Sequence, residues 1–308
     1  MDPNPIIDKM TENFKMLYAA LKTAFKNWWS KDPFKESAVI AYYAIFSLPG
    51  LLVVILTLAG YFFGHDAVNG QLSKQFTSTM GAETALQIQD IIAKGTQSKD
   101  SFWATVLGIV TILLGSTGVF VQFQKSLNDI WEVKVDVKKS GIWDVIKVRI
   151  FSFGLLIAIL FILTVSLVIS ATITAFGNWI INYFSASLLI FMQFLNFALS
   201  LGVLAILFAS MFKLFPDAKI KWSHVWVGAL LTAILFEIGK FTLGFYFGTA
   251  EPSASYGAAG SIILILLWVS YSSMIVFYGA EFTHAYAKLK DGRVIPGEHA
   301  VKVKVTKD

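Results

Sequence analysis

The 308-residue chain contains no cysteine, which excludes disulfide bonds, thiolate metal sites and cysteine nucleophiles. Charge is also scarce, because Asp, Glu, Lys and Arg together make up only 15% of the sequence. The four histidines show no metal-ligand spacing, and no glycine-rich phosphate loop of the Walker type is present. We therefore expect a protein that is not an enzyme, that has no catalytic residues and that uses neither a metal nor another cofactor.

Apolar residues are abundant instead, at 56% of the chain, and the mean hydropathy is +0.66. A hydrocarbon core about 30 Å thick needs roughly 20 apolar residues per helix, and a helix satisfies its backbone hydrogen bonds internally. The sequence predicts an all-α polytopic membrane protein whose domain, residues 37–287, is a bundle of six transmembrane helices. We place the spans at about 38–63, 102–122, 150–173, 188–214, 225–248 and 261–286.

The basic residues are distributed unevenly over the loops between these spans. Four segments contain 21 of the 25 Lys and Arg residues, and alternation of the loops puts all four on one side of the membrane: 1–36, 123–149, 213–224 and 287–308. Positive charge marks the cytoplasmic face of membrane proteins, so we expect both termini in the cytoplasm. Because this topology accounts for the basic pI of about 9.1, we expect no nucleic-acid partner.

The two ends of the chain differ in character from the spans. Residues 1–36 carry apolar and aromatic side chains from Phe14 to Trp29 at helical spacing, with Lys15, Lys22 and Lys26 on another face. This pattern predicts an amphipathic helix lying in the cytoplasmic membrane interface. A helix packed against the cytoplasmic ends of the bundle is the alternative. The polar residues 288–308 are expected to form a flexible cytoplasmic tail.

The fifth span contains the most informative pair of residues. Glu237 and Lys240 lie near the middle of this span, one turn apart on one helical face, where a charge in hydrocarbon is costly. The same stripe carries the small residues Ala229, Ala233, Gly244 and Gly248, so we expect this face to look into the bundle. The pair is a candidate substrate or ion site. An internal ion pair that fixes the helix register is the alternative.

Other spans supply further candidates for the site or for its hinges. In the first span, Pro49 with Ser47 and Gly50 predicts a kink or break that would expose backbone near the site. Tyr246, Tyr256 and Glu281 are expected to line or gate the ends of the site. Glu281 and His284, one turn apart, would relay protons or cap the helix end. Small residues predicted to serve packing or hinge roles are Gly50, Gly115, Gly118, Gly228, Gly244 and Gly248.

The order of several short elements resembles the YihY/BrkB family of bacterial inner-membrane proteins over roughly residues 20–290. The elements are Ser47-Leu48-Pro49, Leu127-Asn128-Asp129-Ile130-Trp131, Gly228 with Glu237-Ile238-Gly239-Lys240 and Tyr246, Tyr256-Gly257, Leu267-Trp268 and Gly279-Ala280-Glu281. The resemblance implies six membrane helices and a location in the bacterial inner membrane. It also implies links to virulence, through serum resistance, and to movement of envelope lipids. The family's older label of ribonuclease BN is regarded as a misnomer.

Three hypotheses for function follow. A transporter or lipid-translocating protein would use the interior polar site for an anionic substrate, such as a lipid head group, with Lys240 attracting it and Glu237 carrying a proton. A non-catalytic scaffold for envelope assembly would use the pair only structurally. A ribonuclease is the least favoured, because the sequence lacks a metal-binding carboxylate cluster. Expected partners are membrane lipids and a small or lipid anion, and the sequence leaves a homo-oligomer open.

Overall fold

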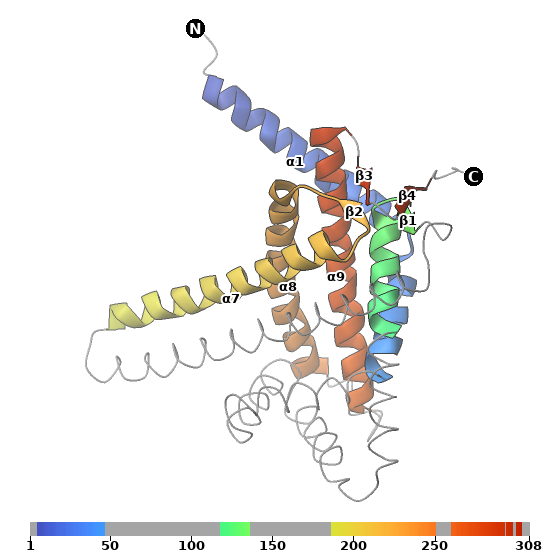
Figure 1. The fold of residues 1–308 in the computed structure, drawn as a ribbon. Helices are drawn as coiled ribbons and strands as arrows, with labels where there is room; N and C mark the ends of the chain where they lie inside the picture. The colour runs from blue at the N-terminus through green and yellow to red at the C-terminus, as the bar shows by residue number, and fades with distance from the viewer. Residues whose placement is uncertain are drawn as a thin grey trace, which may run out of the picture.

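The structure is a computed structural model, and it describes residues 5–46, 118–135, 186–250, 260–292, 294–297 and 300–303. The described part is mostly helical (Figure 1). Four labelled helices are α1 (Pro5–Ser30), α7 (Ala186–Leu214), α8 (Trp222–Ala250) and α9 (Gly260–Asp291). Residues 33–46 and 118–130 are also helical. Four short strands are β1 (Val133–Val135), β2 (Ala218–Lys219), β3 (Ile295–Pro296) and β4 (Ala300–Lys302).

Three helices are long and apolar enough to cross a membrane. The apolar stretches are Phe197–Leu214 in α7, Trp222–Phe247 in α8 and Ile262–Asp291 in α9. They correspond to the last three predicted spans, with α8 and α9 each extending a few residues beyond the predicted limits. The predicted span 150–173 and most of spans 38–63 and 102–122 lie outside the described residues. A mostly helical structure with three candidate membrane spans is therefore confirmed, whereas the number of six spans stays a prediction.

Helices α8 and α9 lie side by side and antiparallel (Figure 1), with a reciprocal contact between glycine and threonine. A Cβ atom added to Gly228 of α8 would overlap the hydroxyl of Thr283 of α9. In the same way, a Cβ on Gly279 of α9 would overlap the hydroxyl of Thr232 of α8. Each threonine hydroxyl donates to a carbonyl four residues earlier in its own helix, at 2.7 Å. Small residues thus bring the two backbones together while no hydroxyl is left without a partner.

Aromatic side chains fill the core between α7, α9 and the helical segment 118–130. The Phe120 and Phe215 rings lie 4.6 Å apart between centroids, and Phe123 stacks against Phe277 of α9 at 5.5 Å. Phe212 and Leu127 are fully buried in the same core. Burial of such rings supplies most of the packing energy of a core, so this cluster fixes the segment 118–130 against the bundle.

Helix α1 packs against α9 and also presents an aromatic stripe to its surroundings. Ala20 and Ala24 are fully buried on α9, and the Trp28 indole nitrogen donates to the Met274 carbonyl at 3.1 Å. This face of α1 therefore packs against the bundle, as the alternative to an interfacial helix predicts. A second stripe of α1 is exposed and follows helical spacing: Phe14, Tyr18, Phe25 and Trp29. The exposed stripe agrees with the prediction that the opposite face of α1 lies in the membrane interface, which stays a prediction.

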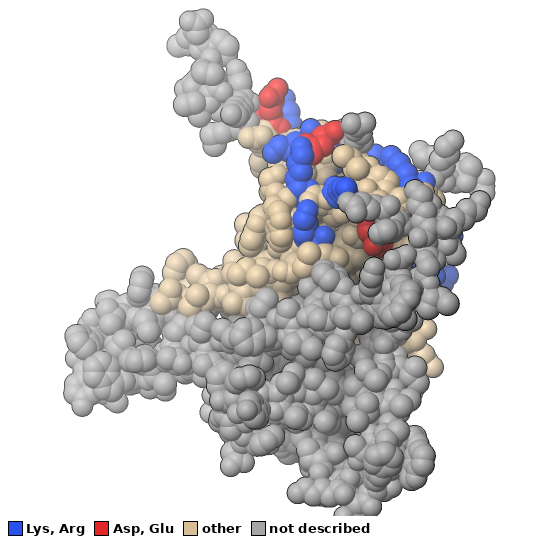
Figure 2. Space-filling view, viewed as in Figure 1, with Lys and Arg blue, Asp and Glu red and all other residues tan. Residues whose placement is uncertain are grey.

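The end of the bundle at which α9 leads into β3 and β4 is tied together by two short antiparallel strand pairs. In the first, β1 pairs with β4 in the register Val133 to Lys302, and the Val303 amide donates to the Glu132 carbonyl at 2.9 Å. In the second, β2 pairs with β3. Residues of the segment predicted to be a flexible tail thus bond to two interhelical loops, which composition did not predict. Figure 2 shows Lys side chains gathered at this end, called the basic end below.

Candidate functional site

Glu237 and Lys240 of α8 form an ion pair, with Lys240 Nζ 2.5 Å from Glu237 Oε2. Because α8 is helical through both positions, their spacing places the side chains one turn apart on one face. The Glu237 side chain is 6% exposed and that of Lys240 is 32% exposed. From α7, the Ser200 hydroxyl donates to Glu237 Oε1 at 3.4 Å. The carboxylate is therefore held inside the bundle, while the ammonium group reaches its edge.

Aromatic side chains form the apolar wall next to this pair. Phe236 packs its ring edge-to-face on Phe208 of α7 at 5.6 Å and on Trp268 of α9 at 6.3 Å. Tyr271 lies directly against Gly239, where a Cβ atom would come within 2.7 Å of its ring. Lys240 Nζ lies 5.5 Å from the centre of the Phe241 ring. In such a low-dielectric setting each charge depends strongly on its partner.

The depth of the pair follows from the helix geometry. The apolar stretch of α8 runs from Trp222 to Phe247. At 1.5 Å per residue, Glu237 lies about 22 Å along the axis from Trp222 and about 15 Å from Phe247. A hydrocarbon core is about 30 Å thick, so the pair lies well inside it. The prediction of an intramembrane charged pair therefore agrees with the helix limits, and its function stays a prediction.

A second buried carboxylate, Glu281 of α9, has a different partner from the one that the sequence suggested. Lys31, just after α1, places its Nζ atom 2.7 Å from Glu281 Oε1 and donates to the Asp129 carbonyl at 3.1 Å. The Glu281 side chain is 1% exposed. His284 packs on the Trp131 ring instead, with 5.2 Å between ring centroids. Glu281 thus joins α1, α9 and the segment 118–130 at the basic end.

The predicted site residues do not come together around one point. The glycine and threonine contacts place Glu281 at the level of residue 230 of α8, so it lies about 10 Å along the axis from Glu237. Tyr246 lies about 14 Å beyond Glu237 in the other direction and is 46% exposed. Ser47, Pro49 and Tyr256, and the predicted hinge residues Gly50 and Gly115, lie outside the described residues.

The remaining glycines predicted to serve packing differ in their surroundings. Gly228 meets Thr283 as described above, and a Cβ on Gly118 would come 2.7 Å from the Tyr43 ring. Gly244 has nothing within 4 Å of its would-be Cβ among the described residues. Gly248 lies within α8. Close packing thus explains two of these glycines and not Gly244.

One polar contact at the basic end was missed by reasoning from the sequence. The Asn128 side-chain amide donates to Asp217 Oδ2 at 2.8 Å, and the Asp217 amide donates to Asn128 Oδ1 at 2.8 Å. Gln124 donates to the same carboxylate oxygen at 3.4 Å. These bonds join the segment 118–130 to the loop after α7. The sequence offered one signal for this contact: Asp217 is the single acidic residue in the lysine-rich loop 213–224.

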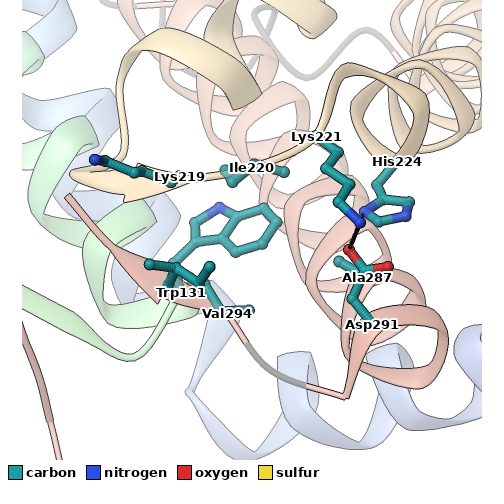
Figure 3. A pocket seen from close by; sticks show the side chains of 9 residues that line it. Trp131, Lys219, Ile220, Lys221, His224, Ala287, Asp291 and Val294 are labelled. Carbon is teal, nitrogen blue, oxygen red and sulfur yellow. Dashed lines mark ion pairs between the residues drawn. The ribbon is translucent and has the colours of Figure 1, made fainter.

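A pocket of about 240 Å³ opens at the basic end, between the starts of α8 and β3 and the end of α9. Figure 3 shows the Trp131 indole on one side and Lys221, His224 and Asp291 on the other. Lys221 Nζ lies 2.9 Å from Asp291 Oδ2, and His224 Nδ1 lies 3.7 Å from the same oxygen. The pocket is thus apolar on one wall and charged on the other.

Two carboxylates beside this pocket have shifted pKa values. Burial raises the pKa of Asp129 above its usual value, and the charge of Lys125 opposes this shift only in part. Burial also works against the charged form of Glu132, but His284 and Lys288 outweigh it and lower the Glu132 pKa. The ammonium group of Lys288 lies 3.3 Å from Glu132 Oε1. Glu132 is thus held charged, next to Trp131.

The described residues contain no group of three His, Asp or Glu side chains arranged to bind a metal ion. In the part of the chain that the structure describes, the candidate chemistry therefore includes two ion pairs with a buried carboxylate and a pocket. Each ion pair joins a carboxylate to a lysine, and the pocket combines lysines with an indole. These groups suit the binding of an anion or a proton.

Comparison with known proteins assigns the chain to a membrane protein family. The family model described as virulence factor BrkB matches residues 24–302. A UPF0761 membrane protein of Pseudoalteromonas atlantica is 27% identical, over 84% of this chain and 83% of its own length. The ribonuclease-like protein YfkH of Bacillus subtilis is 26% identical, over 88% of this chain and 97% of its own length.

A UPF0761 membrane protein of Saccharophagus degradans is 27% identical over 86% of this chain, but the match spans only 58% of that relative. No solved structure matches the chain. The family match agrees with the apolar helices α7, α8 and α9. The resemblance inferred from the short elements is thereby confirmed, and the chain is an integral membrane protein that belongs to the virulence factor BrkB family.

Proposed function

We propose that this protein translocates an anionic substrate, such as the head group of a lipid, through an interior polar site centred on Glu237 and Lys240. The observation that carries the proposal is an ion pair well inside an apolar span, with Lys240 one-third exposed and Glu237 buried. Ionisable residues at this depth are costly, and they commonly mark the pathways of ions and substrates. The Ser200 hydroxyl from α7 is a third polar group in the same place.

In this proposal Lys240 attracts the anion, because its ammonium group reaches the edge of the bundle. When the anion binds Lys240, Glu237 loses part of its charge partner and can accept a proton. Ser200 then remains as a hydrogen-bond partner for the carboxyl group. We propose no catalytic reaction and no cofactor for this cycle, and the partners are membrane lipids and the anion itself.

We also propose the bacterial inner membrane as the location, with both termini in the cytoplasm. The support is the gathering of lysines at the basic end (Figure 2), where α1 packs on α9 and where β3 and β4 follow α9, since cytoplasmic loops are enriched in Lys and Arg. The basic end would then face anionic lipid head groups of the inner leaflet.

The test is flux in proteoliposomes with labelled anionic lipids and a proton gradient, comparing the parent with the double variant Glu237→Gln, Lys240→Met. We expect flux in the parent and a loss of at least about tenfold in the double variant, the factor for about 1.4 kcal/mol of lost interaction. Parent-like flux in the folded double variant would contradict the proposal and favour the scaffold, in which the pair only fixes the helix register.

A matched control removes a different ion pair. Glu132→Gln, Lys288→Gln eliminates the same two charges at the basic end, where the atoms lie 3.3 Å apart and the Lys288 side chain is 52% exposed. We expect this variant to keep most of the parent's flux, because the pair is partly exposed and contributes little energy. Equal loss of flux in both double variants would point to a general effect of charge removal.

A further inference from the structure

The pocket at the basic end lies at the membrane boundary, where α8 begins its apolar stretch at Trp222. Its volume of about 240 Å³ is below the range of about 300–1,000 Å³ that is usual for drug-sized ligands. It is several times the roughly 30 Å³ that one water molecule occupies in the liquid. A compact chemical group is therefore the size of ligand that fits it.

The most informative wall of this pocket is the Trp131 side chain. Trp131 is 1% exposed, and its indole nitrogen has no hydrogen-bond partner among the described residues. An indole N–H can only donate, and a buried donor without an acceptor costs about 1–3 kcal/mol. Figure 3 shows this nitrogen on the edge of the indole that lies next to Ile220, another residue that lines the pocket. The wall of the pocket thus contains a fixed donor for which the described residues provide no acceptor.

The charges around the pocket favour a negative ligand. Lys219 and Lys221 lie at two of its rims (Figure 3), and Asp291 is the acidic residue that lines it. Asp291 is already paired with Lys221 at 2.9 Å, which reduces its repulsion of an anion. With His224 counted as neutral, the charged residues of the lining are two lysines and one aspartate.

We propose that this pocket binds a phosphate-type oxyanion, with one oxygen accepting the Trp131 indole N–H and the lysines supplying counter-charge. Ile220 and the neighbouring aliphatic side chains then cover the apolar part of the molecule that carries the anion. The anion is either the phosphate of a lipid head group or a soluble phosphate. This inference does not rest on the proposed transport, because the pocket lies at the basic end and the Glu237–Lys240 pair lies deep in the span.

The test observes the donor directly. The full-length protein is purified in an uncharged detergent with ¹⁵N-labelled tryptophan, and the Trp131 indole signal is identified by its absence in Trp131→Phe. Two probes are titrated separately, inorganic phosphate and dihexanoyl phosphatidylglycerol, with an uncharged glycolipid of the same chain length as the reference. We expect the Trp131 signal to shift with at least one anionic probe and not with the glycolipid. A response to phosphate identifies a soluble anion, and a response to the phospholipid alone identifies a head group.

Binding of the responding probe is then measured in variants, using radiolabelled probe and equilibrium dialysis. Trp131→Phe keeps the aromatic packing and loses the donor, so we expect binding weaker by about 3- to 10-fold. Lys221→Gln loses a cation and releases Asp291, for which we expect about 10-fold weaker binding. Lys290→Gln is the matched control: it removes the same charge at the same end, where Lys290 lies over the Tyr286 ring and outside the pocket.

Three results would overturn the inference. One is an unchanged Trp131 signal with both anionic probes. Another is parent-like affinity in Trp131→Phe. The third is equal weakening in Lys221→Gln and Lys290→Gln, because this would show attraction to the basic end as a whole. Thermal unfolding of each variant identifies any loss that comes from misfolding.

Discussion

At the scale of single residues, the contact between Lys31 and Glu281 shows how a buried carboxylate depends on a partner that is distant in the sequence. Lys31 follows α1 and Glu281 lies 250 positions later in α9, yet their charged atoms are 2.7 Å apart. Glu281 is almost completely buried, whereas Lys31 is 39% exposed. Removing one partner leaves the other charge unpaired, which is far more costly when the remaining charge is the buried one.

We therefore predict that Lys31→Met destabilises the protein by roughly 2 kcal/mol, a value reduced from the buried limit because Lys31 is partly exposed. Adding Glu281→Gln should restore part of this loss, although the bond from Lys31 to the Asp129 carbonyl stays absent. Thermal unfolding in detergent measures both effects. Lys26→Met, at an exposed lysine of α1, is the control. Equal unfolding temperatures for Lys31→Met and Lys26→Met would argue against a stabilising pair.

At the scale of elements, the packing of α8 on α9 depends on two glycines facing two threonines. Gly228→Ala places a methyl group where the Thr283 hydroxyl lies, so we predict destabilisation of about 1–3 kcal/mol from overpacking. Gly244→Ala is the matched control, because none of the described residues lies within 4 Å of its new methyl group. We expect this control to unfold at or slightly above the parent's temperature, since alanine favours a helix.

A compensating variant separates overpacking from other effects of Gly228→Ala. Thr283→Ala removes the hydroxyl that the new methyl group meets, so the double variant should recover at least half of the lost stability. The measurement is again the thermal unfolding temperature of the purified protein in detergent. If the stability losses of the two single variants instead add in the double variant, Gly228 is needed for a reason other than its contact with Thr283.

At the scale of the whole molecule, the absence of cysteine makes the proposed topology easy to test. We predict that Lys22→Cys in α1 and Lys290→Cys in α9 react with a membrane-impermeant maleimide only in inside-out vesicles. Thr249→Cys, exposed at the far end of α8, should react only in right-side-out vesicles. The parent contains no thiol and serves as the unlabelled control. Labelling of Lys22→Cys and Lys290→Cys from opposite sides would contradict a common cytoplasmic end.

Hydropathy and residue spacing were enough to predict the class of protein and the three apolar spans within the described part of the chain. Hydropathy depends on composition over some 20 residues, and the Glu237–Lys240 pair depends on spacing within one helix, so both are local properties. Three features became visible only in the folded structure. Glu281 pairs with Lys31, Asn128 bonds to Asp217, and the Trp131 indole lies in the wall of a pocket without a hydrogen-bond acceptor among the described residues. These contacts join residues about 90 to 250 positions apart, and no local pattern determines which distant segments meet.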